Sequence, residues 1–154
     1  MKNFTVCTAE SCTGGNIAHQ ITLVAGSSSY YVGSVVSYAN QVKINTLGVP
    51  AEYIENFGAV SQQTVEAMAT GVRRLMNTDY SIATSGIAGP GGGSAEKPVG
   101  TVWMAVADRE NVYRLCFGLR LNYDDAIRLI KSSGYDFRDD SVLDVVVEYF
   151  LRKG

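Results

Sequence analysis

A hydroxyl and a thiol stand side by side within residues 10–15, where an apolar run ends and a helical pattern begins. Ser11 or Cys12 could act as a nucleophile there. The N–H groups of a helix start, together with those of Gly14 and Gly15, could stabilise an oxyanion or a phosphate. A thiolate at a helix N-terminus has a lowered pKa, which makes Cys12 a rival to the serine. An N-cap in a glycine-rich turn is the alternative without chemistry, and the pattern leaves all three open.

A second group of polar side chains follows the aromatic and β-branched run that ends at Tyr38. Tyr38, Asn40 and Lys43 offer a phenol, an amide and an amine within about two helical turns. A buried lysine loses its proton more readily, because desolvation disfavours the charged form, and it can then serve as a general base. A solvated surface lysine is the alternative, and the spacing does not exclude it.

The glycine-rich segment 89–94 is a third candidate, because successive glycines let the backbone approach a ligand closely. Gly89, Gly91 and Gly92 are the residues expected to face that ligand. The segment does not match the P-loop pattern, which ends in Gly-Lys followed by Ser or Thr. A surface loop without a ligand is the alternative.

The overall composition excludes several classes of function. The chain has 154 residues, 46% of them hydrophobic, and a formal charge of −2, with a pI of about 5.3. No broad basic surface is available for a nucleic-acid backbone or an anionic membrane, so neither is expected as a partner. Three cysteines without framework spacing and one histidine predict neither disulfides nor a metal site. No segment reads as a membrane span or a signal sequence, so we expect a cytoplasmic protein.

Alternating strand and helix patterns must position these residues. Strands are predicted at 4–8, 30–38, 80–83, 99–106 and 112–117, and helices after Gly15, after Tyr38, after an N-cap at Ser61, and at 124–131 and 141–151. The last two strands form a hairpin, and residues 84–94 form a loop. The helix after Ser61 should bury one face made of Val65, Met68, Ala69, Val72 and Leu75. We therefore predict one α/β domain over residues 1–154, with a mixed sheet in a three-layer α/β/α arrangement.

A series of sequence blocks between residues 5 and 107 resembles, in order and spacing, the CinA C-terminal-domain family. Members of this family include nicotinamide mononucleotide deamidases. The blocks are Thr8-Ala9-Glu10-Ser11-Cys12-Thr13-Gly14-Gly15, Ala25-Gly26-Ser27-Ser28, Tyr38-Ala39-Asn40-Gln41-Val42-Lys43, Leu47-Gly48-Val49, Gly58-Ala59-Val60-Ser61, Ser85-Gly86-Ile87-Ala88-Gly89-Pro90-Gly91-Gly92 and Glu96-Lys97-Pro98-Val99-Gly100-Thr101-Val102-Trp103.

The resemblance implies an amidohydrolase with a serine and lysine pair, which falls on Ser11 and Lys43. Tyr38 falls on an assisting tyrosine, and Ser85 on a small hydroxyl residue that is often threonine in relatives. The substrate would be a small nucleotide, hydrolysed without a metal or cofactor, and the enzyme would be a homodimer. The residues expected to bind the substrate are Cys12, Thr13, Gly14, Gly15, Asn40, Gly89, Gly91, Gly92 and Arg120.

The two ends of the chain depart from the family pattern. Relatives usually carry a helix before the first strand, and many carry an N-terminal nucleotide-processing domain, so only the deamidase part is expected here. A family Phe-Ser-Gly-Asp-Arg-like stretch should precede the last helix, yet residues 117–120 lack its aspartate and residues 137–140 match no better. Arg120 or Arg138 is then the expected phosphate ligand. Two alternatives follow: a non-catalytic ligand-binding or assembly module of the same fold, or an amidase for another small amide.

Overall fold

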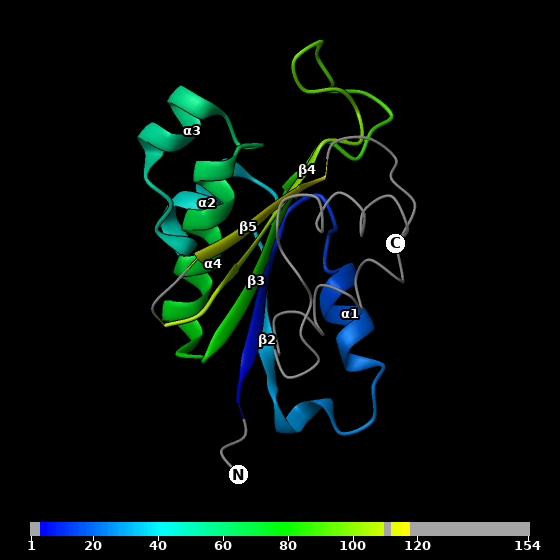
Figure 1. Cartoon of the computed structure of the whole chain (residues 1–154), viewed down its shortest axis with the longest axis vertical. Helices are drawn as coiled ribbons and strands as arrows, with labels where there is room; N and C mark the ends of the chain where they lie inside the picture. The colour runs from blue at the N-terminus through cyan, green and yellow to red at the C-terminus, as the bar shows by residue number, and fades with distance from the viewer. Residues whose placement is uncertain (1–3, 110–111, 118–154) are drawn as a thin grey trace, which may run out of the picture. The chain divides into compact units, whose positions relative to one another are not determined.

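The computed structural model describes residues 4–109 and 112–117, which lie in one compact unit, Met1–Phe117. Within them, one mixed sheet has the strand order β2-β1-β3-β4-β5 (Figure 1). The elements are β1 (Val6–Glu10), α1 (Asn16–Thr22), a 3-10 turn (Ser27–Ser29), β2 (Tyr31–Val36), α2 (Asn40–Leu47), α3 (Ala51–Phe57), α4 (Gln62–Met76), β3 (Tyr80–Gly86), β4 (Val102–Ala107) and β5 (Val112–Phe117). The predicted α/β class is confirmed.

The order of the strands explains the layers and the place of a ligand crevice. β1 runs parallel to both β2 and β3, whereas β4 and β5 continue as an antiparallel pair. The chain passes from β1 sideways to β2 and then back across β1 to β3. Because such crossovers are right-handed, α1 and the group α2–α4 lie on opposite faces, as Figure 1 shows. The direction of the connections therefore reverses between β1 and β3, and the carboxyl ends of these two strands border the point where open α/β sheets bind ligands.

The main core lies between α4 and the sheet. Val65, Met68 and Val72 of α4 are fully buried and pack against small side chains of the sheet such as Cys7 and Ala9. Each such burial contributes about 1.5–3 kcal/mol. This packing fixes α4 close to β1 and β3, the strands whose ends carry two of the candidate segments.

Ser61 caps α4 as predicted, since its Oγ accepts a hydrogen bond from the Thr64 N–H at 3.3 Å. The prediction that Leu75 joins the buried face is wrong, because its side chain is 54% exposed. Met76 packs against the core instead. With 3.6 residues per turn, the position four residues after Val72 continues the buried stripe better than the position three residues after it.

The predicted loop at 84–94 begins later than expected. Thr84 and Ser85 continue β3 and pair with β4, and both side chains are buried. Their polarity led to the prediction of a loop, but both hydroxyl groups form hydrogen bonds within the fold.

The strand predicted from residue 99 starts only at Val102. α3 was not predicted; it has only seven residues, and none of them is fully buried, although Tyr53 and Ile54 pack against the core. The helices predicted at 124–131 and 141–151 lie outside the described residues.

Gly71 lets α4 approach the end of α2. A Cβ at this position would lie 2.8 Å from the carbonyl carbon of Leu47 and closer still to its oxygen. We expect Gly71→Ala to destabilise the protein, because overpacking costs about 1–3 kcal/mol, which exceeds the gain of about 1 kcal/mol in helix propensity. Urea unfolding measures this loss, with Arg74→Ala on the exposed side of α4 as the control. An unchanged or increased free energy of unfolding in Gly71→Ala would contradict the close packing.

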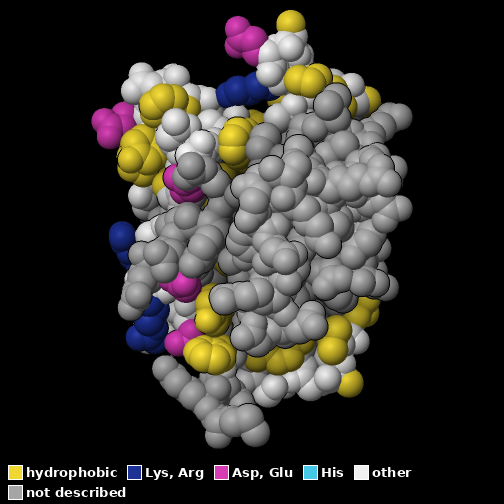
Figure 2. Space-filling model, in the orientation of Figure 1, with side chains coloured by type: hydrophobic (Ala, Val, Ile, Leu, Met, Phe, Trp, Pro, Cys, Tyr) yellow, Lys and Arg dark blue, Asp and Glu magenta, His cyan; other side chains and the backbone are white. Residues whose placement is uncertain are grey.

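The described surface carries charges of both signs. On the face drawn in Figure 2, Lys and Arg side chains are interspersed with Asp and Glu side chains and form no continuous basic area among the residues described. Within the same residues, no helix combines the length and the apolar character needed to cross a bilayer.

Candidate active site

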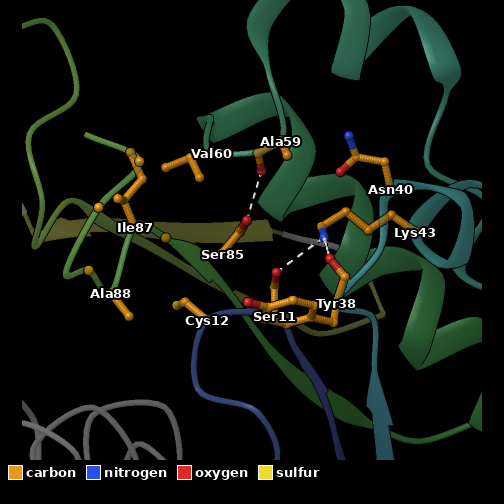
Figure 3. Close-up of a pocket in the computed structure, with 14 residues that line it drawn as sticks. Ser11, Cys12, Tyr38, Asn40, Lys43, Ala59, Val60, Ser85, Ile87 and Ala88 are labelled. Atoms are coloured by element: carbon orange, nitrogen blue, oxygen red, sulfur yellow. Dashed lines mark hydrogen bonds between the residues drawn. The ribbon is translucent and has the colours of Figure 1, made fainter. Parts of the chain in front are cut away.

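A cavity of about 320 Å³ lies where β1, β2 and β3 end (Figure 3). Its size falls at the lower end of the range of roughly 300–1,000 Å³ for small-molecule sites. It is lined by Ser11, Cys12, Tyr38, Asn40, Lys43, Ala59, Val60, Ser85, Gly86, Ile87, Ala88, Gly89, Gly91 and Gly92. The three segments that the sequence singled out separately therefore meet in one place.

Ser11 and Lys43 point at one another across the floor of this cavity (Figure 3). Lys43 Nζ lies 3.1 Å from Ser11 Oγ, 2.6 Å from the Ser37 carbonyl oxygen and 3.2 Å from the Tyr38 carbonyl oxygen. A neutral amine has two hydrogens and one lone pair. The two carbonyls can accept both hydrogens, which leaves the lone pair for the hydroxyl hydrogen of Ser11. This is the arrangement of a nucleophile and its general base.

Lys43 is buried. Of the two alternatives that the sequence left open, a buried general base and a solvated surface lysine, the structure therefore favours the first. The Lys43 side chain is 1% exposed. Leu47 follows one helical turn after Lys43 on the same face of α2, and Leu47 belongs to the core. Burial lowers the pKa of Lys43 from its ordinary value of 10.5, and the nearby Cys12 partly offsets this effect. The fraction of neutral amine near pH 7 is therefore increased.

Cys12 also lines the cavity, but its chemistry differs from the expectation. Burial raises the pKa of its thiol, and the charge of Glu10 raises it further, although the N–H groups of Cys12 and Thr13 act in the opposite direction. The expected lowering at a helix start is therefore wrong. The main physical reason is burial, which disfavours the thiolate, and the negative charge of the neighbouring Glu10 adds to it.

The turn after Cys12 supports the site instead of lining the cavity. Thr13, Gly14 and Gly15 are absent from the lining residues. The Thr13 hydroxyl donates to Glu10 Oε2 at 2.7 Å, and the Gly15 N–H donates to the same oxygen at 3.0 Å. No role was predicted for Glu10 from the sequence. The available signal was an acidic residue shortly before a helix whose N-cap, Gly15, has no capping side chain.

Ser85, Tyr38 and Asn40 occupy other parts of the wall. The Ser85 hydroxyl donates to the Ala59 carbonyl oxygen at 2.7 Å, so it must rotate before it can donate to a ligand. Serine is not β-branched, which keeps that rotation inexpensive. Tyr38 is 78% exposed at the rim, and Asn40 is exposed as well.

The glycine-rich loop closes the remaining side of the cavity. Gly89 and Gly92 have φ angles of 88° and 86°, a conformation that favours glycine. A Cβ at Gly89 would also lie 2.6 Å from Val99 Cγ1. Arg120 and Arg138 lie outside the described residues. Where the chain is described, no three His, Cys, Asp or Glu side chains gather as metal ligands.

The comparison with known families identifies the family of this chain. The model of the CinA C-terminal domain matches residues 1–131. The chain belongs to the CinA C-terminal domain family. The CinA-type blocks named above include Ser11, Tyr38, Lys43 and Ser85, all of which line the cavity.

Individual relatives show how far the similarity extends. A CinA-like protein of Cytophaga hutchinsonii is 50% identical over 128 residues, which cover 83% of this chain and 31% of the relative. Another, from Shewanella piezotolerans, is 45% identical over 148 residues, covering 94% of this chain and 35% of that protein. The chain thus spans about a third of the length of these relatives.

Solved structures of the CinA superfamily share the fold. The competence/damage inducible protein CihA of Agrobacterium tumefaciens has a TM-score of 0.74 at 42% identity, covering 84% of this chain and 81% of that one. A CinA superfamily protein of Klebsiella pneumoniae has a TM-score of 0.76 at 31% identity, covering 98% and 86%.

Proposed function

We propose that this chain hydrolyses the carboxamide of nicotinamide mononucleotide, releasing nicotinic acid mononucleotide and ammonia. The observation that carries the proposal is a buried Lys43 Nζ 3.1 Å from Ser11 Oγ, at the floor of a cavity of about 320 Å³. A serine next to a buried amine suits acyl transfer. The choice of substrate rests on the family resemblance, whose members include deamidases of this nucleotide.

The reaction would proceed through an acyl-enzyme. Neutral Lys43 takes the hydroxyl proton while Ser11 Oγ forms a bond to the carboxamide carbon, and the carbonyl oxygen becomes an oxyanion. The lysine then gives this proton to the amide nitrogen, the C–N bond breaks, and ammonia leaves. In the second half, Lys43 takes a proton from water, the water oxygen attacks the ester carbon, and that proton returns to Ser11 as the C–O bond to the serine breaks; the carboxylic acid product then loses its own proton to solvent.

The oxyanion needs donors that are in place before charge develops. The backbone N–H groups of Cys12 and Thr13 are our first candidates, because both are directed at the adjacent Cys12 sulfur and act to lower the pKa of its thiol. The Ser85 hydroxyl is another candidate once it has turned away from Ala59. For the phosphate of the substrate, Arg120 and Arg138 remain predictions. A homodimer also remains a prediction.

The direct test is turnover by the wild-type chain. Purified protein is incubated with nicotinamide mononucleotide, and ammonia and nicotinic acid mononucleotide are measured together; we expect equal amounts of the two. Nicotinamide riboside serves as the matched compound that lacks only the phosphate. Binding of the nucleotide without ammonia release would favour the non-catalytic module. Turnover of a different small amide alone would favour the other amidase.

A further inference from the structure

Glu10 has a fully buried carboxylate that accepts hydrogen bonds at both oxygens. Its side chain is 0% exposed. Oε2 accepts from Thr13 Oγ1 at 2.7 Å, from the Gly15 N–H at 3.0 Å and from the Ile17 N–H at 3.0 Å, while Oε1 accepts from the Ala18 N–H at 2.8 Å. All four donors belong to the turn and the first helical turn that follow the nucleophile.

This carboxylate replaces the missing cap of α1. The N-cap residue of α1, Gly15, provides no side-chain acceptor, and the first N–H groups of a helix have no partner within it. Glu10 satisfies them with charge-assisted hydrogen bonds and also matches the positive end of the helix. The same charge excludes a second anion, so the start of α1 is not available to a substrate phosphate. Thr13 and Gly15 therefore hold the turn to Glu10.

The backbone of Glu10 reaches the other half of the catalytic pair. Its carbonyl oxygen accepts from the Ser37 N–H at 2.7 Å and from Ser37 Oγ at 3.4 Å. The carbonyl of Ser37 in turn accepts from Lys43 Nζ at 2.6 Å. Through its side chain, Glu10 thus contacts the turn that follows the nucleophile. Through its backbone, Glu10 contacts Ser37, at the strand end that holds the base.

We propose that Glu10 is a positioning residue, which holds Ser11 Oγ within reach of Lys43 Nζ by anchoring the turn that follows Ser11. This inference rests on the proposed function only in taking Ser11 and Lys43 as the reacting pair. It requires an ionised carboxylate. Glutamine would direct its NH₂ group at an N–H or hydroxyl donor whichever way it is oriented, because donors reach both oxygens of Glu10.

The test measures the reactivity of the Ser11–Lys43 pair without the nucleotide substrate. A fluorophosphonate labels an activated serine: Ser11 Oγ forms a bond to phosphorus, the P–F bond breaks, fluoride leaves, and Lys43 takes the hydroxyl proton. We expect Glu10→Gln to be labelled about 10- to 100-fold more slowly, since small misplacements of reacting atoms have effects of this size. Glu55→Gln, on an exposed glutamate of α3, is the matched control with the same chemical change.

Steady-state kinetics on nicotinamide mononucleotide separate positioning from binding. We expect kcat to fall in Glu10→Gln by the factor found for labelling, while KM stays within about twofold of wild type. If wild type labels but does not turn over this nucleotide, the proposed substrate fails and the labelling result still decides the role of Glu10. All rates are normalised to the folded fraction from circular dichroism.

A milder variant keeps the proposal testable if Glu10→Gln does not fold. Thr13→Val keeps the shape of the side chain but removes the hydroxyl that donates to Glu10 and bonds to Thr84; slower labelling is expected there too. The proposal is overturned if folded Glu10→Gln labels within about twofold of wild type or loses activity through KM alone. It is equally overturned if Glu10→Gln is unfolded and Thr13→Val labels at the wild-type rate.

Discussion

Ser11→Ala is expected to abolish ammonia release from nicotinamide mononucleotide, with a fall in kcat of about four to six orders of magnitude. The variant has no oxygen to form the acyl-enzyme. Cys12→Ala is expected to keep most of the activity, because the hydrogen bond of Lys43 runs to Ser11 and burial raises the pKa of the Cys12 thiol, which keeps it protonated.

Two readouts distinguish the serine from the thiol. Ammonia release gives the rate, and mass spectrometry after fluorophosphonate treatment identifies the labelled residue. Activity that survives in Ser11→Ala would remove this serine from the mechanism. Loss in Cys12→Ala with retention in Ser11→Ala would identify the thiol as the nucleophile. Unfolding midpoints of the two variants serve as the control for folding.

Lys43→Met is expected to lower kcat by about 100- to 10,000-fold, which is the second large effect. This factor is the usual contribution of a general base. Methionine suits the burial of the lysine stem but cannot accept the Ser11 proton. Lys43→Arg should be equally inactive, since a guanidinium keeps its proton at any working pH. An active Lys43→Met enzyme would show that another group takes the proton.

The pH dependence follows from the direction of the Lys43 pKa. Burial lowers it below 10.5, so wild-type kcat/KM should rise with pH up to that lowered pKa and then level off. Stability should change in the same direction. Between the folded pKa and 10.5 the unfolded chain binds more protons, so the free energy of unfolding rises with pH in this window. The penalty is fully present below the folded pKa and disappears above the unfolded one. Comparing urea midpoints of wild type and Lys43→Met across pH isolates it.

The substrate itself should assist the base. A pyridinium ring beside Lys43 favours the uncharged amine, as any adjacent cation does. The pKa seen in kcat should therefore lie below the pKa seen in kcat/KM, because the first reports the substrate complex and the second the free enzyme. Equal values in the two profiles would count against this assistance.

The sequence predicted those elements whose side chains show a clear apolar period. The helix after Ser61 and the hairpin of β4 and β5 are examples. It failed where tertiary contacts override local character, as at Thr84 and Ser85, which are polar yet buried within β3. α3 was not predicted, because it is a seven-residue helix whose apolar side chains are only partly buried against the core.

The candidate site was predictable only in part. Local pattern selected the segments around Ser11 and Lys43, but it left open whether the lysine is buried, since that depends on where α2 packs. The pairing of these two residues came from the family resemblance. The role of Glu10 was missed because its carboxylate folds back onto the start of α1, which is a tertiary contact. The raised pKa of Cys12 was missed because it follows mainly from burial, which the local pattern does not show.

The base and its two carbonyl partners all come from residues 37–43, whereas the nucleophile comes from a different strand. Their separation is therefore a direct measure of how β2 is aligned with β1, where Glu10 pairs with Val36. Strand alignment changes only in whole residues, and a slip of one residue turns every side chain to the opposite face. β2 is an edge strand of the described sheet. The reactivity of one serine should accordingly report, in an all-or-none manner, whether this edge strand has docked correctly.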